Sequence, residues 1–431
     1  MTQPDLVLRG GTVLTPAAAL AVDVAVRDGR IHALGPGLPR GGVEIDCTGR
    51  LVTPGMLNLH CHAAMVPLRG LGEDVPDRLS RVIWPLEQAL VDAAFVRLGA
   101  AFGLGEQLLS GVTTTVDLYF FEDQVAEVAD RLGIRLIAGH TIADQPMPDA
   151  ATSDAALAAI PISVARWRGH PLIQPALAPH GPHTVADATL RAIADLSERY
   201  DLPVLTHLAE TLGETTAIHR RAGVSPVRYL DQVGLLTPRL IAAHGIHLDA
   251  GDIDLIARRG AVIAHCVGAN TKAAKGTAPL PGLLAAGCKV GLGTDGPMSG
   301  NTLDIQGQLA QVAKVHKLIT RDRSLLPSRT LLDIATQAAA DAIGRPDLGR
   351  IAPGAAADLV VWGLDHPSLQ PNHDPYATLV YAASPRDVRE VIVAGRRVVI
   401  DGRLASQDLD ELRQPLLSLA QRCRDTAMGL A

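Results

Sequence analysis

Aromatic residues, cysteine and lysine are all scarce in this sequence of 431 residues. Phe, Tyr and Trp together make up 3% of the chain, so the hydrophobic core must be built from aliphatic side chains. The five cysteines are odd in number, widely spaced and never arranged as Cys-x-x-Cys. This pattern excludes a disulfide framework and a cysteine-based zinc knuckle, and it predicts a protein of the reducing cytoplasm.

An excess of basic residues and long apolar runs are also missing. The 39 basic and 45 acidic residues give a formal net charge of −6, which argues against a nucleic-acid-binding protein. No uninterrupted apolar run reaches the roughly 18 residues of a membrane span, and the N-terminal residues do not resemble a secretion signal. We therefore expect neither a membrane protein nor a secreted one.

The middle of the chain contains apolar segments that alternate with longer helical patterns, whereas both ends read as short strands and turns. Asp28-Gly29 between two apolar runs predicts a β-hairpin. Strands alternating with helices predict a parallel sheet, and eight such units predict an α/β fold, the closed (β/α)8 barrel. An open doubly wound sheet is the alternative, but no G-x-G-x-x-G follows the first of these strands. The predicted strands are 56–60, 112–117, 135–139, 173–178, 204–207, 240–244, 262–265 and 290–295.

Polar residues lie at the carboxyl ends of these predicted strands. In a barrel those ends meet at one mouth, which is where active sites form. Residues without a shared role would be scattered along the strands, so we predict that this mouth is the active site. The residues are His60, Asp117, His207, His244, His265 and Asp295, with His180 just beyond another strand.

Four residues at this mouth could bind a metal ion. His60 and His62 stand two apart in an extended segment, so their imidazoles point to the same side. His207 adds a third imidazole and Asp295 adds a carboxylate oxygen. One His-x-His pair is weak evidence, and a lone Asp commonly caps a helix, but four candidate ligands at one mouth favour a metal site. Three imidazoles and one carboxylate suit zinc, and iron fits as well.

Glu210 and His244 are the predicted proton-transfer and polarising groups. Glu210 follows His207 by three residues, and a carboxylate at the edge of a cavity can move the proton of a metal-activated water. A solvated residue in a first helical turn is the alternative for Glu210, and a core histidine is the alternative for His244. We assign His265 a supporting or structural role.

Several of these segments resemble motifs of the amidohydrolase superfamily. The resemblance covers essentially the whole chain and implies a TIM-like barrel over 55–348, with a small β-sandwich domain built from 1–54 and 349–431, the latter including a terminal helix. It also implies that His60, His62, His207 and Asp295 bind metal, that Glu210, His244 and Asp295 are catalytic, and that the protein forms a homo-oligomer. The motifs are Pro54-Gly55-Met56-Leu57-Asn58-Leu59-His60-Cys61-His62, Thr206-His207-Leu208-Ala209-Glu210, Ala243-His244, Gly293-Thr294-Asp295-Gly296 and Gly349-Arg350-Ile351-Ala352-Pro353-Gly354.

The scarcity of lysine distinguishes two branches of that superfamily. Members with two metal ions bridge them with a carboxylated lysine at the end of the fourth barrel strand. That region reads Leu177-Ala178-Pro179-His180 here, and the first lysine of the chain is Lys272, so we predict one divalent ion. The other zinc deaminase architecture requires P-C-x-x-C, which this chain lacks.

On the substrate side, the segments 62–65, 68–70, 83–87 and 178–180 resemble the 5′-methylthioadenosine/S-adenosylhomocysteine deaminases and related chlorohydrolases. This resemblance implies that Glu87 holds the ribose hydroxyls and that His180 contacts the base. Two acceptor oxygens suit a vicinal diol, although a solvated helix residue is the alternative for Glu87. His140 and His183, also predicted to bind substrate, stand where the subgroup has an arginine and a tyrosine.

The sequence therefore predicts a mononuclear metal-dependent hydrolase that releases ammonia from a purine-type heterocycle. An adenine nucleoside such as 5′-methylthioadenosine, S-adenosylhomocysteine or adenosine is the favoured substrate. The same chemistry on guanine, a pterin or a triazine is the first alternative. Ring-amide hydrolysis and a non-catalytic barrel follow. We expect a small-molecule partner and neither nucleic acid nor membrane.

Overall fold

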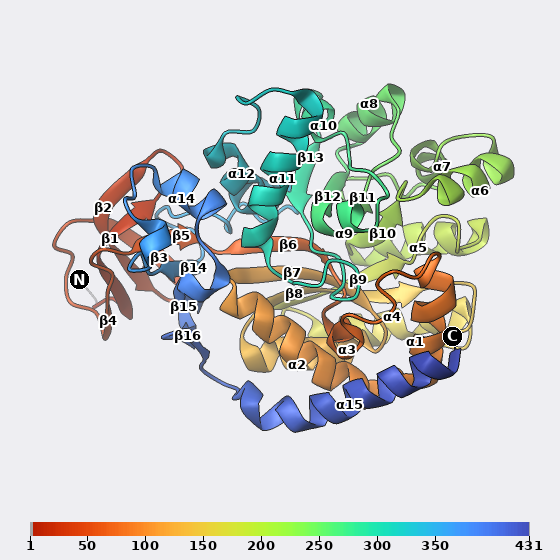
Figure 1. Cartoon of the computed structure of the whole chain (residues 1–431), viewed down its shortest axis with the longest axis horizontal. Helices are drawn as coiled ribbons and strands as arrows, with labels where there is room; N and C mark the ends of the chain where they lie inside the picture. The colour runs from red at the N-terminus through yellow and green to blue at the C-terminus, as the bar shows by residue number, and fades with distance from the viewer. Residues whose placement is uncertain (1–2, 431) are drawn as a thin grey trace.

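The computed structural model describes residues 3–430 and contains two β-sheets, which lie side by side along the long axis of the molecule (Figure 1). One is an eight-stranded parallel sheet in the order β13-β12-β11-β10-β9-β8-β7-β6, formed by the middle of the chain. The other has nine strands contributed by both ends of the chain. The predicted barrel, with an additional β-domain from both termini, is confirmed.

All eight predicted barrel strands are present, each within a few residues of its expected bounds. The last strand differs most, because it ends at Leu292 rather than at 295. Asp295 has a φ of +61°, which is incompatible with an extended strand, and it lies beyond β13, where it forms only an isolated bridge with Cys61. The strands are β6 (Met56–Cys61), β7 (Val112–Tyr119), β8 (Arg135–Ile142), β9 (Ile173–Pro179), β10 (Val204–Leu208), β11 (Leu240–His244), β12 (Val262–His265) and β13 (Lys289–Leu292).

Helices follow the barrel strands and form an outer layer around them (Figure 1). Short aliphatic side chains fill the barrel interior, among them Leu57, Leu59 and Ala176, as the low aromatic content requires. The helices are η1 (Ala63–Leu68), η2 (Leu79–Ile83), α1 (Trp84–Leu90), α2 (Ala93–Leu109), α3 (Glu122–Leu132), α4 (Ser153–Trp167), α5 (Asp187–Tyr200), α6 (Leu212–Ala222), α7 (Pro226–Gln232), α8 (Ala250–Arg259), α9 (Val267–Lys272), α10 (Leu280–Ala285), α11 (Ile305–Thr320), α12 (Ser328–Ala335) and α13 (Gln337–Ala342).

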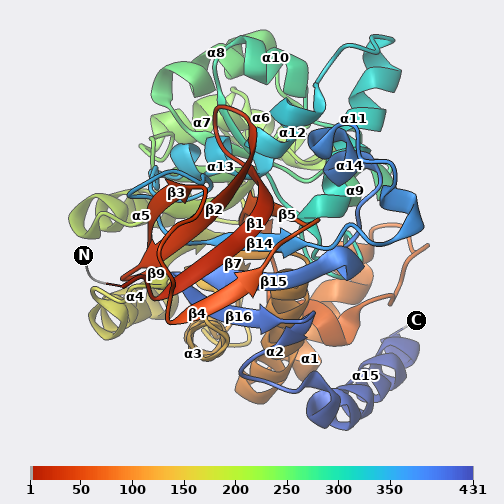
Figure 2. The same ribbon diagram turned by 90° about the vertical axis from the view of Figure 1, so that its left-hand side faces the viewer.

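The β-domain encloses its own core of aliphatic side chains, and Figure 2 views it face-on. The predicted hairpin is present: Asp28 and Gly29, with φ of +51° and +72°, form the two-residue turn between β2 and β3. The strands are β1 (Leu6–Leu14), β2 (Ala19–Arg27), β3 (Arg30–Gly35), β4 (Val43–Asp46), β5 (Leu51–Pro54), β14 (Leu359–Trp362), β15 (Val388–Val393), β16 (Arg396–Ile400) and β17 (Arg403–Leu404), with η3 (Pro367–Leu369), α14 (Pro375–Tyr381) and η4 (Pro385–Asp387) between them.

A buried ion pair joins the β-domain to the barrel. The guanidinium of Arg135, at the start of β8, donates from Nε and Nη2 to the two carboxylate oxygens of Asp358 at 2.7 and 3.0 Å. Burial opposes the charge, but the facing carboxylate raises the pKa of Arg135 above its ordinary value. The pair therefore fixes the domain junction at the amino end of the barrel, opposite the mouth.

The C-terminal helix α15 (Leu409–Leu430) runs along the outside of the barrel and packs on α2, η1 and α1 (Figure 1). Within residues 3–430, no single helix is long and apolar enough to cross a membrane. The pair Leu79–Leu90 and Ala93–Leu109, bent by 116°, meets that criterion together, by length and composition alone.

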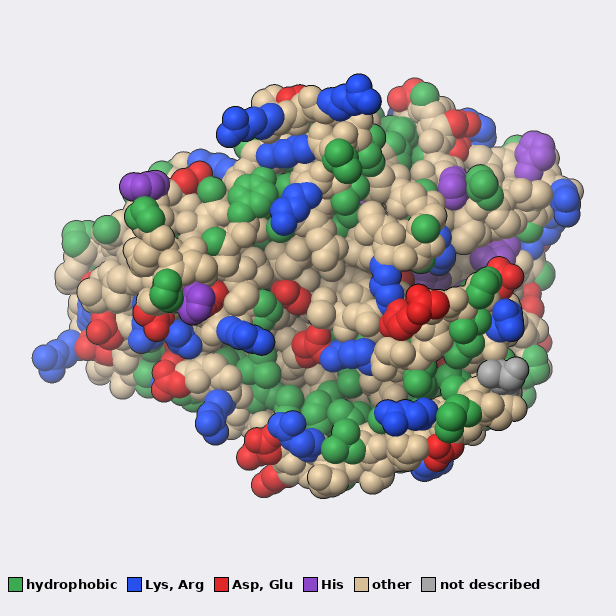
Figure 3. Space-filling model, viewed as in Figure 1, with side chains coloured by type: hydrophobic (Ala, Val, Ile, Leu, Met, Phe, Trp, Pro, Cys, Tyr) green, Lys and Arg blue, Asp and Glu red, His purple; other side chains and the backbone are tan. Residues whose placement is uncertain are grey.

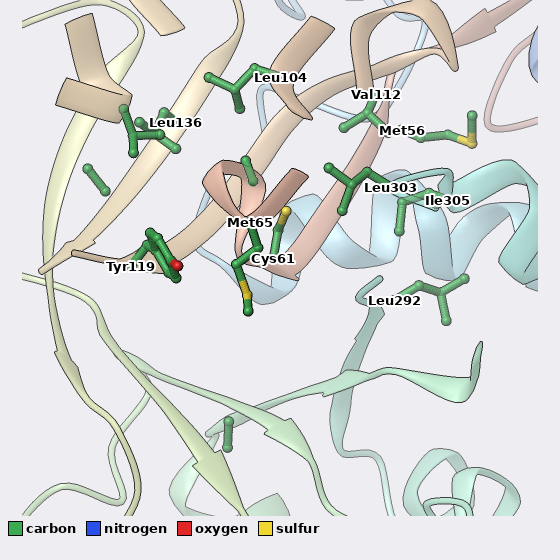
Figure 4. Close-up of a cluster of buried hydrophobic side chains, with 14 of the residues drawn as sticks. Met56, Cys61, Met65, Leu104, Val112, Tyr119, Leu136, Leu292, Leu303 and Ile305 are labelled. Carbon is green, nitrogen blue, oxygen red and sulfur yellow. The ribbon is translucent and has the colours of Figure 1, made fainter. Parts of the chain in front are cut away.

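The barrel closes where its first and last strands meet, through a few hydrogen bonds. The amides of Thr294 and Asp295 both donate to the carbonyl of His60 at 3.1 Å. Asn58 adds a side-chain clamp, accepting from the Thr294 amide at 3.1 Å and donating to its hydroxyl at 2.8 Å. Cys61 and Asp295 form a single parallel bridge. Around this seam, Met56, Cys61, Leu292 and other buried apolar side chains pack together (Figure 4).

Candidate metal centre and active site

Three imidazoles converge at the mouth of the barrel. One nitrogen each from His60 and His62, at the end of β6, and from His207, in β10, lie within 4.8 Å of one another, and all three residues are buried. The carboxylate of Asp295 faces them: its Oδ1 lies 3.2 Å from Nε2 of His62 and 3.7 Å from Nε2 of His60. The structure thus brings all four predicted ligands together.

The orientation of these rings fits a bound cation. Nδ1 of His62 donates to the carbonyl of Leu118, and Nδ1 of His207 donates to the carbonyl of His180, both at 2.5 Å. Each ring therefore turns Nε2 toward the site, and the two Nε2 atoms lie 3.4 Å apart. Nε2 of His60 is buried without a hydrogen-bond partner among the described residues. Buried ring nitrogens that converge on one point in this way would be stabilised by a positive ion between them.

The protonation states of three of the four predicted ligands also fit a bound cation. Burial lowers the pKa of His60 and of His207 well below the ordinary value, which keeps both imidazoles neutral. Burial opposes ionisation of Asp295, but its contacts with His62 and the other imidazoles hold the pKa of this carboxyl well below its usual range. His62 differs: burial opposes its charge, but the hydrogen bond and charge of Asp295 raise its pKa to about 9, so a bound metal ion would have to displace this proton.

A second cluster lies next to the first. Carboxylate oxygens of Glu210 and Asp295 and a nitrogen of His244 are within 4.8 Å of one another. Nδ1 of His244 donates to Oδ1 of Asn270 at 2.9 Å, so its Nε2 faces the site, 3.6 Å from Oε1 of Glu210. Nζ of Lys275 donates to the same oxygen of Glu210 at 2.6 Å. The residues predicted to carry the proton and to polarise the substrate, Glu210 and His244, thus lie beside the candidate metal position.

Both clusters open into one cavity of about 640 Å³. Its wall includes Glu87, which is 6% exposed and accepts a hydrogen bond from the hydroxyl of Tyr119 at 2.9 Å. Burial raises the pKa of Glu87 to about 7. Met65, Trp84 and other apolar side chains supply much of the remaining wall. In Figure 3, acidic and basic side chains meet beside a hollow on this face.

Comparison with known proteins identifies the family. The sequence model of the amidohydrolase family matches residues 51–398. The chain belongs to the amidohydrolase family. It is 38% identical over 419 residues to the 5-methylthioadenosine/S-adenosylhomocysteine deaminase of Nitratidesulfovibrio vulgaris, with 95% of each chain covered.

Two solved structures of amidohydrolases are closely similar to this one. A zinc-bound adenosine deaminase from Xanthomonas campestris superposes with a TM-score of 0.96 at 33% identity, covering 98% of this chain and 99% of that one. The zinc complex of atrazine chlorohydrolase from Arthrobacter aurescens gives a TM-score of 0.89 at 26% identity, covering 96% and 100%. Both relatives hold zinc, in agreement with the histidine-rich site of this amidohydrolase.

The four residues predicted to bind substrate are not all placed alike. Glu87, His180 and His183 line the cavity. The ring of His180 lies between the rings of Trp84 and His207, with centroids 6.1 and 4.8 Å away, and burial lowers its pKa to about 4.

The structure does not bring His140 to the cavity. Its Nε2 lies 2.8 Å from the hydroxyl of Ser163 on α4 and 3.8 Å from Asp123 on α3. Successive side chains of a strand face opposite sides, and in β8 the next residue, Thr141, is the one that lines the cavity. His265 likewise turns away from both clusters and contacts His316 on α11, Nε2 to Nε2, at 3.2 Å.

Sequence reasoning missed several residues that this amidohydrolase places at the site: Tyr119, Asn270 and Lys275. Tyr119 follows Asp117 by two residues at the end of β7, so strand alternation could have indicated it. Lys275 carries a compositional signal, because two of the five lysines of the chain, Lys272 and Lys275, lie at this mouth. Asn270 has no comparable signal in the sequence.

Proposed function

We propose that this amidohydrolase is a mononuclear metal-dependent deaminase of adenine nucleosides such as 5′-methylthioadenosine, S-adenosylhomocysteine or adenosine. One observation carries the proposal: the buried carboxylate of Glu87 lies in the same cavity as the metal-ligand cluster and the Glu210–His244–Asp295 cluster. The cavity thus offers a hydrolytic centre and a partner for ribose hydroxyls. The names of the two deaminase relatives support the same reaction, the cleavage of a C–N bond by water.

We propose that His60, His62, His207 and Asp295 hold one divalent ion, with zinc favoured by the relatives and iron also compatible with the ligands. When bound, such an ion supplies Lewis-acid activation of water, lowering its pKa to about 7. The chain itself then has to orient the attacking water, move its proton and hold the heterocycle.

In this proposal Glu210 carries the proton. Its carboxylate takes a proton from the attacking water and delivers it to the ring nitrogen next to the amino-bearing carbon, so the carbon becomes tetrahedral. His244, held by Asn270 with Nε2 toward the site, and Asp295 orient the water. The remaining proton of the added hydroxyl then moves to the amino group. Collapse of the tetrahedral carbon to a carbonyl breaks the exocyclic C–N bond and releases ammonia.

We expect about one tightly bound divalent ion per chain in the active enzyme. The fourth barrel strand ends without a lysine that could be carboxylated to bridge a second ion. One set of three imidazoles and a carboxylate completes a four-ligand site. Elemental analysis of purified protein, before and after chelation and re-addition of zinc, measures this. Two ions per chain in fully active enzyme would contradict the mononuclear site.

Glu87→Ala is expected to lower kcat/KM for a ribonucleoside by about 10- to 150-fold. The ionised form of Glu87, which predominates above its pKa of about 7, would accept hydrogen bonds from the ribose hydroxyls that contribute roughly 1.5–3 kcal/mol, so the assay is run at pH 8 or above. The matched control is the same variant with 2′,3′-dideoxyadenosine, which lacks those hydroxyls, and the loss should shrink there. Equal losses on both substrates would show that Glu87 does not bind the sugar.

The main alternative is the same hydrolytic chemistry on a heterocycle without a sugar. The similarity to atrazine chlorohydrolase supports this alternative. Incubating the enzyme with 5′-methylthioadenosine, S-adenosylhomocysteine, adenosine, guanine, a pterin and an aminotriazine, and measuring ammonia, tests the proposal. The adenine nucleosides should show the highest kcat/KM. A higher value for a sugar-free heterocycle would reverse the assignment.

We extend the proposal to the cellular setting and the assembly. The five cysteines, all within the described residues, are free and buried, which agrees with a reducing cytoplasm. A homo-oligomer and the domain bounds 1–54, 55–348 and 349–431 stay predictions. Proteolysis of the native enzyme and light scattering test them.

A further inference from the structure

The turn that carries Glu210 has an unusual backbone. Between β10 and α6, Ala209 adopts a φ of +50°, a left-handed conformation that side chains rarely adopt. Its carbonyl accepts from the amides of Ile246 and His247 at 3.0 and 2.9 Å, which ties the turn to the segment after His244. The conformation persists because these surroundings hold it.

The carboxylate of Glu214 completes this arrangement. Oε1 accepts from the amide of Ala209 at 2.7 Å, and Oε2 accepts from the amide of Glu210 at 2.8 Å. Glu214 is 3% exposed and lies seven residues beyond His207 in the first turn of α6. One side chain thus binds the two consecutive amides that set the direction of Glu210.

Ordinary helix capping does not account for these contacts. Thr211 and Glu214 have the spacing of a capping box, and the hydroxyl of Thr211 does accept from the amide of Glu214 at 3.1 Å. In such a box the Glu side chain would return to the amide of Thr211, but it binds the two preceding amides instead. Burial also raises the pKa of Glu214 to about 7, a penalty that an exposed capping residue avoids.

The next barrel unit provides the contrast. At the start of α8, Asp249 accepts from the amide of Asp252 at 2.7 Å, and Asp252 accepts from the amide of Asp249 at 3.4 Å. This is a reciprocal capping box, and Asp252 is as buried as Glu214. Asp249 and Asp252 do not line the cavity, whereas Glu214 does. The two acidic residues therefore share position, burial and charge, but only Glu214 binds the turn of a predicted catalytic residue.

We propose that Glu214 is a positioning residue, which holds the Ala209–Glu210 backbone so that the Glu210 carboxylate reaches the substrate ring nitrogen. This rests on the proposed role of Glu210 as proton carrier. The carboxylate of Glu210 also binds Nζ of Lys275, but the side chain of this lysine is 37% exposed and fixes the carboxylate only loosely. The direction of the Glu210 side chain therefore depends mainly on its backbone. Misplacement of a reacting group by about 1 Å can lower a rate by about 10²-fold.

The test compares Glu214→Ala and the isosteric Glu214→Gln with Asp252→Ala, in the zinc-loaded full-length enzyme. We expect kcat to fall by about 10- to 100-fold in both Glu214 variants. KM should stay within about twofold and the metal content should be unchanged. Asp252→Ala should lower the melting temperature while kcat stays near that of the parent. Glu214→Gln keeps one acceptor oxygen and the shape of the side chain. Its kcat therefore tests the proposal even if Glu214→Ala does not fold.

A double-mutant cycle separates positioning from general damage. In a Glu210→Gln background, Glu214→Gln should lower the remaining kcat by less than about threefold, because the group it positions no longer carries a proton. Equal losses in both backgrounds, or an unchanged kcat in the single Glu214 variants, would overturn the proposal while leaving Glu210 as the proton carrier. Near-normal turnover of Glu210→Gln itself would instead overturn both assignments.

Discussion

Glu210→Gln is expected to lower kcat by about 10²- to 10⁴-fold while the protein keeps its fold and its metal ion. The amide has the size of the carboxylate but cannot accept and return a proton, and acid–base groups contribute a factor of this order. Glu210 is outside the three-histidine cluster, so its replacement should leave that cluster complete. The measurement is kcat on the best nucleoside, with metal content and melting temperature determined on the same preparation.

Lys275→Met serves as a partial control for this result, because it removes the ammonium that binds Glu210 and leaves the carboxylate in place. Its effect on kcat should be much smaller than that of Glu210→Gln. If Glu210→Gln turns over the true substrate at a near-normal rate, the proton is carried by another group.

Asp295→Ala should abolish both metal binding and turnover. Asp295 is the proposed anionic ligand, with its carboxylate facing His60 and His62, and it also belongs to the cluster with Glu210 and His244. Losing a supporting hydrogen bond to a metal ligand already lowers metal affinity by about 10- to 100-fold, and losing a ligand should exceed that. Competition with a chromophoric chelator measures the zinc dissociation constant of the variant.

Glu390→Gln is the matched control for this loss, since Glu390 is a buried carboxylate that pairs with Arg397 in the β-domain. That variant should bind zinc as the parent does. Unchanged zinc affinity in Asp295→Ala would remove Asp295 from the ligand set.

The sequence predicted the barrel because hydrophobic periodicity reports local structure well. Each strand is a short apolar run between helical patterns, and its carboxyl end faces the mouth in any closed barrel. The same rule brought His60, His207 and Asp295 together across long stretches of sequence before any contact was known. The rule also explains why His140 was wrongly assigned to the cavity. It predicts where a strand ends but not which side of the strand each side chain faces. His140 and Thr141 are neighbours in β8, and only Thr141 faces the cavity.

Contacts between side chains of different elements could not be predicted in this way. Tyr119 on β7 binds Glu87 on α1, and Asn270 on α9 binds His244 on β11; both pairings depend on how helices pack around the barrel. Glu214 is the clearest case, since its spacing from Thr211 is that of a helix cap. The departure from capping depends on the left-handed turn at Ala209, which nothing in the residue types of that segment indicates.

The seam of the barrel would give the proposed metal site a role in folding. Asn58 and Thr294, which clamp the first strand to the segment after the last, are 236 residues apart in the sequence. A cation held by both His60 and Asp295 closes this long loop much as a covalent cross-link would, and loop closure in the unfolded chain becomes costlier with length, though slowly. Binding to the folded state alone adds RT ln(1 + [L]/Kd) to its stability. The apoprotein should therefore exchange the amide hydrogens of Thr294 and Asp295 faster than the holoprotein, with the β-domain unaffected.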